Sequence, residues 1–317
     1  MAKKYKAKTA AEIHAEIADK FIEMLEAGVV PWRKPWTVLG EPANLISGKP
    51  YRGINPIILG LCPYNSPYWL TYKQAQELGG HVKKGEKSTM IVFFKRIGIE
   101  DKEQTDKEGN PLKKFIPLLK CIRVFNVEQC ENLKHKRLDE YEAKVEEFKN
   151  RAKNDQGVIE QAEAIIKTMP NCPPIVEIGD RAFYQPSTDS ITMPPKHLFE
   201  ELVEFYQTLF HEMIHSTGHE KRLSREGVTN LSFFGSHRYG KEELIAELGA
   251  SMLSHEAGIV NEKMIENSAA YLGSWIKTIR EDPSIIIGAA SKAQAAVDYV
   301  LDREAPVYED DKEREVA

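Results

Sequence analysis

A run of apolar residues between positions 202 and 217 has the spacing of a buried α-helix. The apolar side chains that cover nearly the whole of its surface are Leu202, Val203, Phe205, Tyr206, Leu209, Phe210, Met213 and Ile214. One polar stripe remains, formed by Thr208, His211, Glu212 and His215. Because polar groups are costly to bury without partners, this stripe indicates a functional site. Gly218 predicts the end of the helix, since glycine tolerates the left-handed turn that follows a last helical residue.

The same pattern of apolar and polar positions predicts mixed α and β structure elsewhere. The predicted elements are helices over 11–27, 72–78, 158–169 and 241–250, and strands over 89–96 and 118–127. The polar stretch 100–114 predicts a loop between those two strands. Residues 181–193 predict a short hairpin around a Pro-Ser-Thr-Asp turn. Its edge is a candidate for holding an extended peptide, and a plain hairpin that covers the core is an alternative of at least equal weight.

Residues 211–215 read HEMIH, which places two histidines four apart on one face of the predicted helix. A catalytic zinc site has three protein ligands and an open position for water, whose pKa falls from about 15.7 to about 7. His211 and His215 are two candidate ligands, and Glu212 is a candidate general base. This arrangement is typical of a metallopeptidase. His237 and Tyr239 are candidate hydrogen-bond donors to an oxyanion, although the sequence does not place them.

The third metal ligand has two main candidates. Lys221 stands where a metzincin carries its third histidine, six residues after His215, so the sequence excludes that class. Glu243 and Glu247 share a face of the helix over 241–250, which is rich in small residues that allow close approach. We interpret Glu243 as the ligand and Glu247 as a carboxylate that orients a histidine, and the reverse assignment stays open. A solvated helix face of Glu and Lys is the other alternative.

Charge divides the chain into a basic and an acidic half. The net charge is −5, but residues 1–130 hold 21 Lys and Arg against 14 Asp and Glu, whereas the remainder holds 22 against 34. A basic half is typical of a nucleic-acid-binding module joined to a module with another task. We therefore predict an α+β protein with two domains: an α+β DNA-binding domain over 1–135, a linker or helix over 136–155, a mostly helical domain with a small sheet over 156–305, and a frayed acidic tail over 306–317.

Aromatic and cationic residues are interleaved in the basic half, as in proteins that bind single-stranded DNA. Bases stack on aromatic rings while cations contact the phosphates. The candidate DNA-binding residues are Trp32, Arg33, Lys34, Trp36, Tyr51, Arg52, Trp69, Tyr72, Lys83 and Lys84. The alternative is that the tryptophans anchor the core and the lysines decorate a turn. Weaker binding to duplex DNA is expected, since stacking needs an open ring face.

The cysteines and the apolar segments of the sequence indicate in which cellular compartment the protein is expected. Four cysteines are scattered without a CxxC pair, so the sequence suggests neither a disulfide framework nor a cysteine zinc site. With 42% hydrophobic residues the chain can form sizeable cores. No signal peptide and no apolar run of membrane-spanning length is apparent. We therefore expect a cytoplasmic protein without a membrane partner.

Motifs in both halves of the chain carry a resemblance to a known family. They are 28–36 (GVVPWRKPW), Asn44, 47–55 (SGKPYRGIN), 69–72, 79–86, 180–182, 210–219 (FHEMIHSTGH), 222–223, 242–247, Trp275 and 289–293. These motifs resemble those of the ArdC-type antirestriction proteins of conjugative plasmids, whose relatives include polyvalent proteins of phages and mobile elements. The resemblance implies a single-stranded-DNA-binding domain followed by a zincin-like metallopeptidase domain. It also implies that the protein protects incoming plasmid or phage DNA from restriction enzymes of the recipient.

The leading hypothesis is an antirestriction protein that binds single-stranded DNA and carries a peptidase with one divalent metal. Zinc is the first choice, and manganese also suits a ligand set of two histidines and a glutamate. The peptidase substrate would be a protein of the host restriction system. One alternative is a DNA shield with a structural, non-catalytic metal site. Another is a regulatory metalloprotease that cuts a repressor or a restriction subunit.

Overall fold

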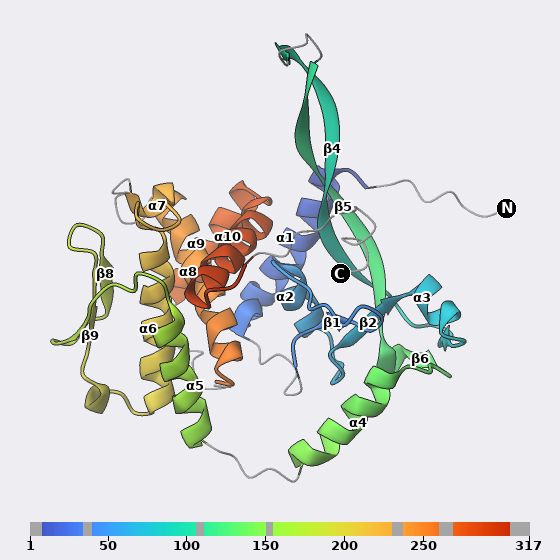
Figure 1. Cartoon of the computed structure of the whole chain (residues 1–317), viewed down its shortest axis with the longest axis horizontal. Helices are drawn as coiled ribbons and strands as arrows, with labels where there is room; N and C mark the ends of the chain where they lie inside the picture. Colours follow the sequence, from blue (N-terminus) through green and yellow to red (C-terminus); the bar gives the residue numbers. More distant parts are fainter. Residues whose placement is uncertain are drawn as a thin grey trace.

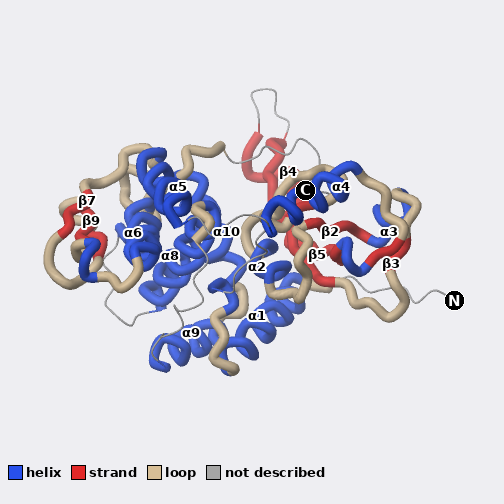
Figure 2. Tube along the Cα trace, turned by 90° about the horizontal axis from the view of Figure 1, so that it is seen from below, coloured by secondary structure: helices blue, strands red, loops and turns tan. Residues whose placement is uncertain are grey.

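The structure of the chain is a computed structural model that describes residues 8–33, 40–105, 111–149, 155–229, 237–259 and 269–304. It confirms the predicted α+β class and the two-part organisation. Figure 1 shows a part with the main sheet and a long hairpin on one side and a bundle of helices with a small sheet on the other. Figure 2 shows the same separation, with most strands gathered at one end and most helices at the other.

The N-terminal part is built on a four-stranded sheet in the order β1-β2-β5-β4, in which only the β1–β2 pair is parallel. Its strands are β1 (Ala43–Asn44), β2 (Tyr68–Thr71), β4 (Thr89–Thr105) and β5 (Pro111–Asn126). A second sheet pairs β3 (His81–Val82) with β6 (Cys130–Glu131). The helices of this part are α1 (Ala10–Glu26), η1 (Pro31–Arg33), α2 (Asn55–Gly60), α3 (Tyr72–Glu77) and η2 (Val127–Gln129).

The hairpin of β4 and β5 corrects the loop predicted over 100–114. Strand pairing continues from Thr89 opposite Val124 out to Asp101 opposite Leu112, with an irregularity beyond Asp101. Polar side chains there do not prevent a strand, because the antiparallel partner supplies hydrogen bonds to every second backbone group. The hairpin therefore projects from the molecule as a long two-stranded arm (Figure 1).

The C-terminal part consists of a bundle of helices with a three-stranded sheet, in the order β7-β9-β8, at its edge beside α6 (Figure 1). Its sheet contains β7 (Ile175–Glu177), β8 (Phe183–Gln185) and β9 (Ser190–Met193). Its helices are α5 (Asp155–Thr168), η3 (Lys196–Leu198), α6 (Leu202–Thr217), α7 (Glu226–Thr229), α8 (His237–Glu256), α9 (Ala269–Glu281) and α10 (Ile285–Val300). Helix α4 (Lys136–Lys149) runs between the two parts along the chain (Figure 1). No helix among the described residues is long and apolar enough to cross a membrane.

Helix α1 joins the two parts, because its apolar face packs against α9. A capping box starts the helix: Glu12 N–H donates to the Thr9 hydroxyl oxygen at 3.3 Å, and Thr9 N–H donates to the Glu12 carboxylate at 2.7 Å. Further along, the ring of Trp32 lies between Phe21, 6.4 Å away and stacked, and Trp275, 5.1 Å away and edge-on. The N-terminal and C-terminal parts therefore share one continuous hydrophobic core.

Candidate metal centre

Helices α6 and α8 bring the polar stripes predicted from the sequence face to face. Met213 and Ile214 are fully buried on α6, and small residues on α8 let its backbone come close. A Cβ atom at Gly249 would lie only 2.8 Å from the side chain of Ile214, so any larger residue there would push the helices apart. Ala246 is also fully buried on α8. This close packing sets the separation between His211 and Glu243.

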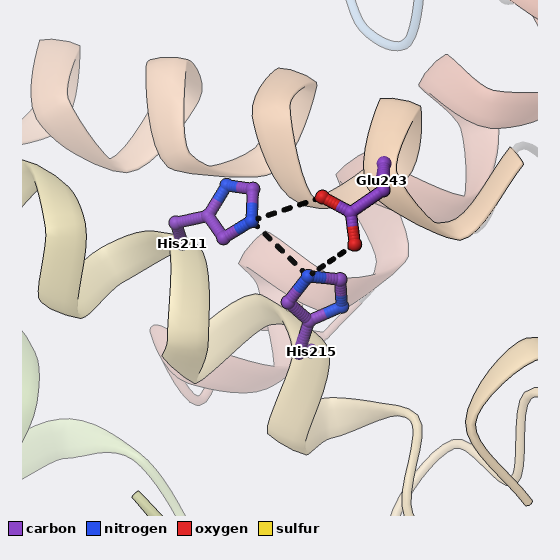
Figure 3. Close-up of side chains that lie close together, drawn as sticks. All are labelled: His211, His215 and Glu243. Atoms are coloured by element: carbon purple, nitrogen blue, oxygen red, sulfur yellow. Dashed lines mark hydrogen bonds and ion pairs between the residues drawn. The ribbon is translucent and has the colours of Figure 1, made fainter. Parts of the chain in front are cut away.

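The side chains of His211, His215 and Glu243 converge on one point (Figure 3). The two Nε2 atoms lie 3.1 Å apart, and the Glu243 oxygens lie 3.5 Å from His211 Nε2 and 3.4 Å from His215 Nε2. Tetrahedral zinc with bonds of about 2.0–2.1 Å holds its ligand atoms about 3.3 Å apart. The donor atoms therefore have the type and the spacing that one divalent ion requires. They are the only such group found among the described residues.

Two further carboxylates face the other nitrogen of each histidine ring. Glu247 lies 3.9 Å from His211 Nδ1, and Glu242 lies 3.6 Å from His215 Nδ1. Histidines that bind metals commonly donate their second ring N–H to such a carboxylate, which fixes the ring orientation and the tautomer. Of the two candidates for the third ligand, Glu243 is the one whose oxygens lie near both histidine Nε2 atoms. Glu247 lies instead near the Nδ1 atom of His211.

No role of its own was predicted for Glu242 from the sequence, although it lies in the segment 242–247 that carries the resemblance. It is only 5% exposed and pairs with Arg225, whose Nη2 and Nε lie 2.6 and 3.2 Å from Glu242 Oε1. Arg225 also donates to the backbone oxygen of Ile214 at 2.7 Å. Glu242 lies between the charged residues Lys241 and Glu243, and the sequence does not show which of three adjacent charged side chains faces the interior.

The charges at the site favour a cation. Burial lowers the pKa of His215, but hydrogen bonds to the Glu242 and Glu243 carboxylates outweigh it and raise the pKa to about 10. Burial raises the pKa of Glu243, and the bonds from His211 and His215 more than offset it, holding that pKa well below its usual range. A buried group of carboxylates therefore stabilises positive charge at the point where the three side chains meet.

Glu212 lies next to the converging residues but faces the small sheet. Glu212 is buried, at 8% exposure, and its Oε2 accepts a hydrogen bond from the backbone N–H of Tyr184 on β8 at 2.7 Å. A carboxylate held next to a metal ligand in this way is suited to taking a proton from water. The backbone of His237 and Tyr239 starts α8, but their side chains lie outside the described part of the chain.

The structure separates the predicted DNA-binding residues into distinct groups. Those buried in the core are Trp32, Tyr51 and Trp69, at 0–4% exposure. Arg52 forms an ion pair with Asp298 of α10. The exposed members are Tyr72, Lys83 and Lys84. The side chain of Arg33 and the whole of Lys34 and Trp36 lie outside the described residues. Burial was not apparent from the sequence, because the same aromatic residues suit a core and a stacking surface.

Comparison with known proteins shows the same two parts. Residues 11–125 match the N-terminal domain of anti-restriction factor ArdC, and residues 160–292 match a zincin-like metallopeptidase domain. The crystal structure of the antirestriction protein ArdC from plasmid R388, in its metal-free form, is 36% identical, covers 91% of this chain and 96% of that one, and has a TM-score of 0.69. This chain belongs to the ArdC antirestriction family. The Mn(II)-bound ArdC structure is also similar, with 33% identity and a TM-score of 0.68.

Other relatives of this ArdC-family chain include one protein of similar length and two that are much longer. An uncharacterized protein of Sinorhizobium fredii, y4eC, is 30% identical, and the match covers 92% of each chain. Two Escherichia coli proteins named DNA primase TraC are 38% identical over 91% of this chain. The chain spans only 20% and 27% of the length of these two primases. The zincin-like domain and the Mn(II)-bound relative support a divalent metal in this family.

Proposed function

We propose that this protein binds single-stranded DNA, holds one divalent metal and hydrolyses a peptide bond, and that it thereby protects incoming DNA from host restriction. The observation that carries the peptidase part is the convergence of His211, His215 and Glu243, with Glu212 next to His211 on α6. The family supplies the antirestriction context. Zinc is our first choice of metal, and manganese fits the same donors.

The three converging side chains would hold the ion. A bound divalent ion supplies Lewis acidity, which makes a water molecule more acidic and polarises a carbonyl group. Glu212 would accept the proton of the attacking water, and Glu247 and Glu242 would keep the two histidine rings in place. Helix α6 packs against β8, an edge strand of the small sheet, and Glu212 contacts this strand through the Tyr184 N–H. A peptide extended along that strand would bring its backbone close to Glu212.

For DNA we propose the surface that the structure leaves exposed around α3 and β3. Tyr72 is 52% exposed at the start of α3, and its ring lies 6.4 Å from that of Phe125. Helix α3 packs against β3, which is followed by the exposed Lys83 and Lys84. An exposed ring and two exposed lysines on neighbouring elements suit stacking of one base with contacts to nearby phosphates. The Lys83 ammonium also donates to the backbone oxygen of Glu128 at 2.9 Å. Binding should weaken with salt, with a logarithmic slope of about −0.7 for each neutralised phosphate.

The deciding experiment compares the wild type with Glu212→Gln. Protection of transferred single-stranded DNA from restriction is measured in the recipient, and metal content and oligonucleotide affinity are measured on the purified proteins. We expect Glu212→Gln to keep its metal and its DNA affinity while protection falls. Because Gln can still accept the Tyr184 hydrogen bond, the fold around Glu212 should be retained.

Other outcomes point to the alternatives. Full protection by Glu212→Gln would contradict the peptidase part and leave a DNA shield with a structural metal. Loss of protection by Glu212→Gln, together with full protection by Tyr72→Ala and by Lys83→Ala, would favour a protease that acts on a repressor or a restriction subunit without needing DNA on this surface. A host protein whose cleavage depends on Glu212 would then identify the substrate.

A further inference from the structure

Tyr184 connects Glu212 to a second acidic residue that the proposed function does not use. Its backbone N–H donates to Glu212 Oε2 at 2.7 Å, and its hydroxyl donates to Asp189 Oδ1 at 2.8 Å. Because Tyr184 pairs with Ile191 in the hairpin of β8 and β9, both hydrogen bonds come from a single edge strand. The position of this strand therefore affects the carboxylate of Glu212 directly.

Arg222 fixes the other end of this connection. Its side chain is only 1% exposed, and its guanidinium contacts Asp189 through both terminal nitrogens, one of them 3.3 Å from Oδ2. Nη2 also lies 3.2 Å from the Tyr184 hydroxyl. Nε donates to the backbone oxygen of Ser216 at 2.7 Å, and Nη1 to that of Asn171 at 3.1 Å. All five N–H donors of the guanidinium thus have partners.

These contacts join the end of the HEMIH helix to the hairpin that carries Tyr184. Ser216 directly follows the ligand His215, and Asp189 ends the turn between β8 and β9 with a left-handed backbone (φ 48°). Burial raises the pKa of Asp189, but hydrogen bonds from Arg222 and Tyr184 outweigh it and lower that pKa. Asp189 is therefore ionised at neutral pH, and its bond with Arg222 is charge-assisted.

We propose that Arg222, acting through Asp189 and Tyr184, is a positioning residue for Glu212. It locks strand β8 against the end of α6, and the Tyr184 N–H then keeps the Glu212 carboxylate in one orientation. The proposal rests on the proposed role of Glu212 as the proton acceptor. A positioning role makes a specific prediction: removing the Tyr184 hydroxyl should weaken the hydrogen bond between the Tyr184 backbone N–H and the Glu212 carboxylate.

Tyr184→Phe tests this most cleanly, because it removes the hydroxyl link and keeps the backbone N–H. Tyr206→Phe is the matched control: it removes another α6-region hydroxyl, which donates to the Glu163 carboxylate at 2.6 Å. Hydrogen–deuterium exchange, resolved to single residues by fragmentation, is measured on the full chain loaded with Zn²⁺. We expect the Tyr184 amide to exchange about tenfold faster in Tyr184→Phe, the effect of one lost hydrogen bond, and at the wild-type rate in Tyr206→Phe.

A double variant makes the test independent of any protein substrate. Glu212→Ala removes the acceptor, so Tyr184→Phe should add little further exchange at this amide in a Glu212→Ala background. Arg222→Lys should reproduce the effect of Tyr184→Phe, because Lys cannot make the five-donor contact. If a cleavable substrate is found, Tyr184→Phe should lower kcat and leave KM and the Zn²⁺ affinity unchanged.

An unchanged exchange rate in Tyr184→Phe, additive effects in the double variant, or an equal acceleration in Tyr206→Phe would each overturn the proposal. Absence of proteolysis in the wild type would instead contradict the proposed function. The exchange measurements would then still decide whether Arg222 and Asp189 position Glu212.

Discussion

Glu41 lies where charges from both parts of the protein meet, and its titration should be visible in the stability. It precedes β1 and is partly buried. Burial raises its pKa from 4.5 to about 7, with Glu256 at the end of α8 adding to the rise and Arg303 opposing it. Arg52 and Asp298, which form an ion pair across the two parts, have smaller effects on the Glu41 pKa, and these effects are opposite in direction.

The direction of the change in stability with pH follows from the difference between the Glu41 pKa in the folded chain and in the unfolded chain. A carboxyl group whose pKa is raised by folding binds its proton more tightly in the folded state. The folded state is therefore unaffected below pH 4.5 and loses stability as the pH rises from 4.5 through 7. At about 1.36 kcal/mol for each pH unit, the interval from 4.5 to about 7 gives a loss of at most about 3 kcal/mol. Glu41→Gln carries no charge at any pH and should escape this loss.

The assay is urea unfolding at pH 5 and pH 8, followed by tryptophan fluorescence, since Trp32 and Trp275 lie in the shared core. Between these two pH values the wild type should lose roughly 2–3 kcal/mol relative to Glu41→Gln. Glu23→Gln, an exposed carboxylate change on α1, should differ from the wild type by less than about 0.5 kcal/mol at both pH values. A Glu41→Gln variant that is less stable than the wild type at pH 8, or equally altered at both, would refute the reasoning.

The other predictions concern the core, the DNA surface and the metal site. Trp32→Ala should lower the unfolding free energy by about 3–5 kcal/mol, whereas Tyr72→Ala should leave urea unfolding nearly unchanged and weaken oligonucleotide binding by about 1–3 kcal/mol in fluorescence polarisation. Calorimetric titration should show Zn²⁺ binding abolished in Glu243→Gln and weakened about 10–100-fold in Glu247→Gln. Arg225→Met should cost about 3–5 kcal/mol in urea unfolding, because it leaves the buried Glu242 carboxylate without its arginine partner.

Helices with a strong apolar period were predictable almost to the residue. The helix expected up to Gly218 is α6 (Leu202–Thr217), and the helix expected over 11–27 is α1 (Ala10–Glu26). The apolar period is a local signal, so it can be seen without knowing the fold. Gly218 does follow the last residue of α6, but the left-handed turn expected there is wrong, because its φ is −76°. A Cβ atom at Gly218 would lie 2.5 Å from the side chain of Val228, so close packing is what calls for glycine. The β4–β5 arm has no such signal over 100–114, since its strands are held by pairing with each other and carry few apolar residues.

In the candidate site, too, the features set by local sequence were predictable and those set by packing were not. His211 and His215 share a face because of helical geometry alone, and the spacing of Glu243 and Glu247 places both on one face of a second helix. Their meeting depends on how α6 and α8 pack, which needed the structure. The orientation of Glu242, the partner of His215 Nδ1, depends on the buried Arg225, whose place in the fold no local pattern indicates. Likewise, residue type does not decide whether an aromatic ring faces the core or the solvent.

The shared core limits how the two parts can be studied separately. The Ser251 hydroxyl donates to the backbone oxygen of Trp32, and Ser251 lies on α8 one turn beyond Glu247 and two turns beyond Glu243. The helix that supplies the proposed third ligand is thus attached to the N-terminal part on the same face. A fragment that begins at residue 156 would lack α1 and η1, and it would expose Trp275 and the apolar face of α9. A loss of metal affinity in such a fragment would reflect a displaced α8 as much as a missing DNA-binding surface, so the roles of the two parts are best separated by point variants in the whole chain.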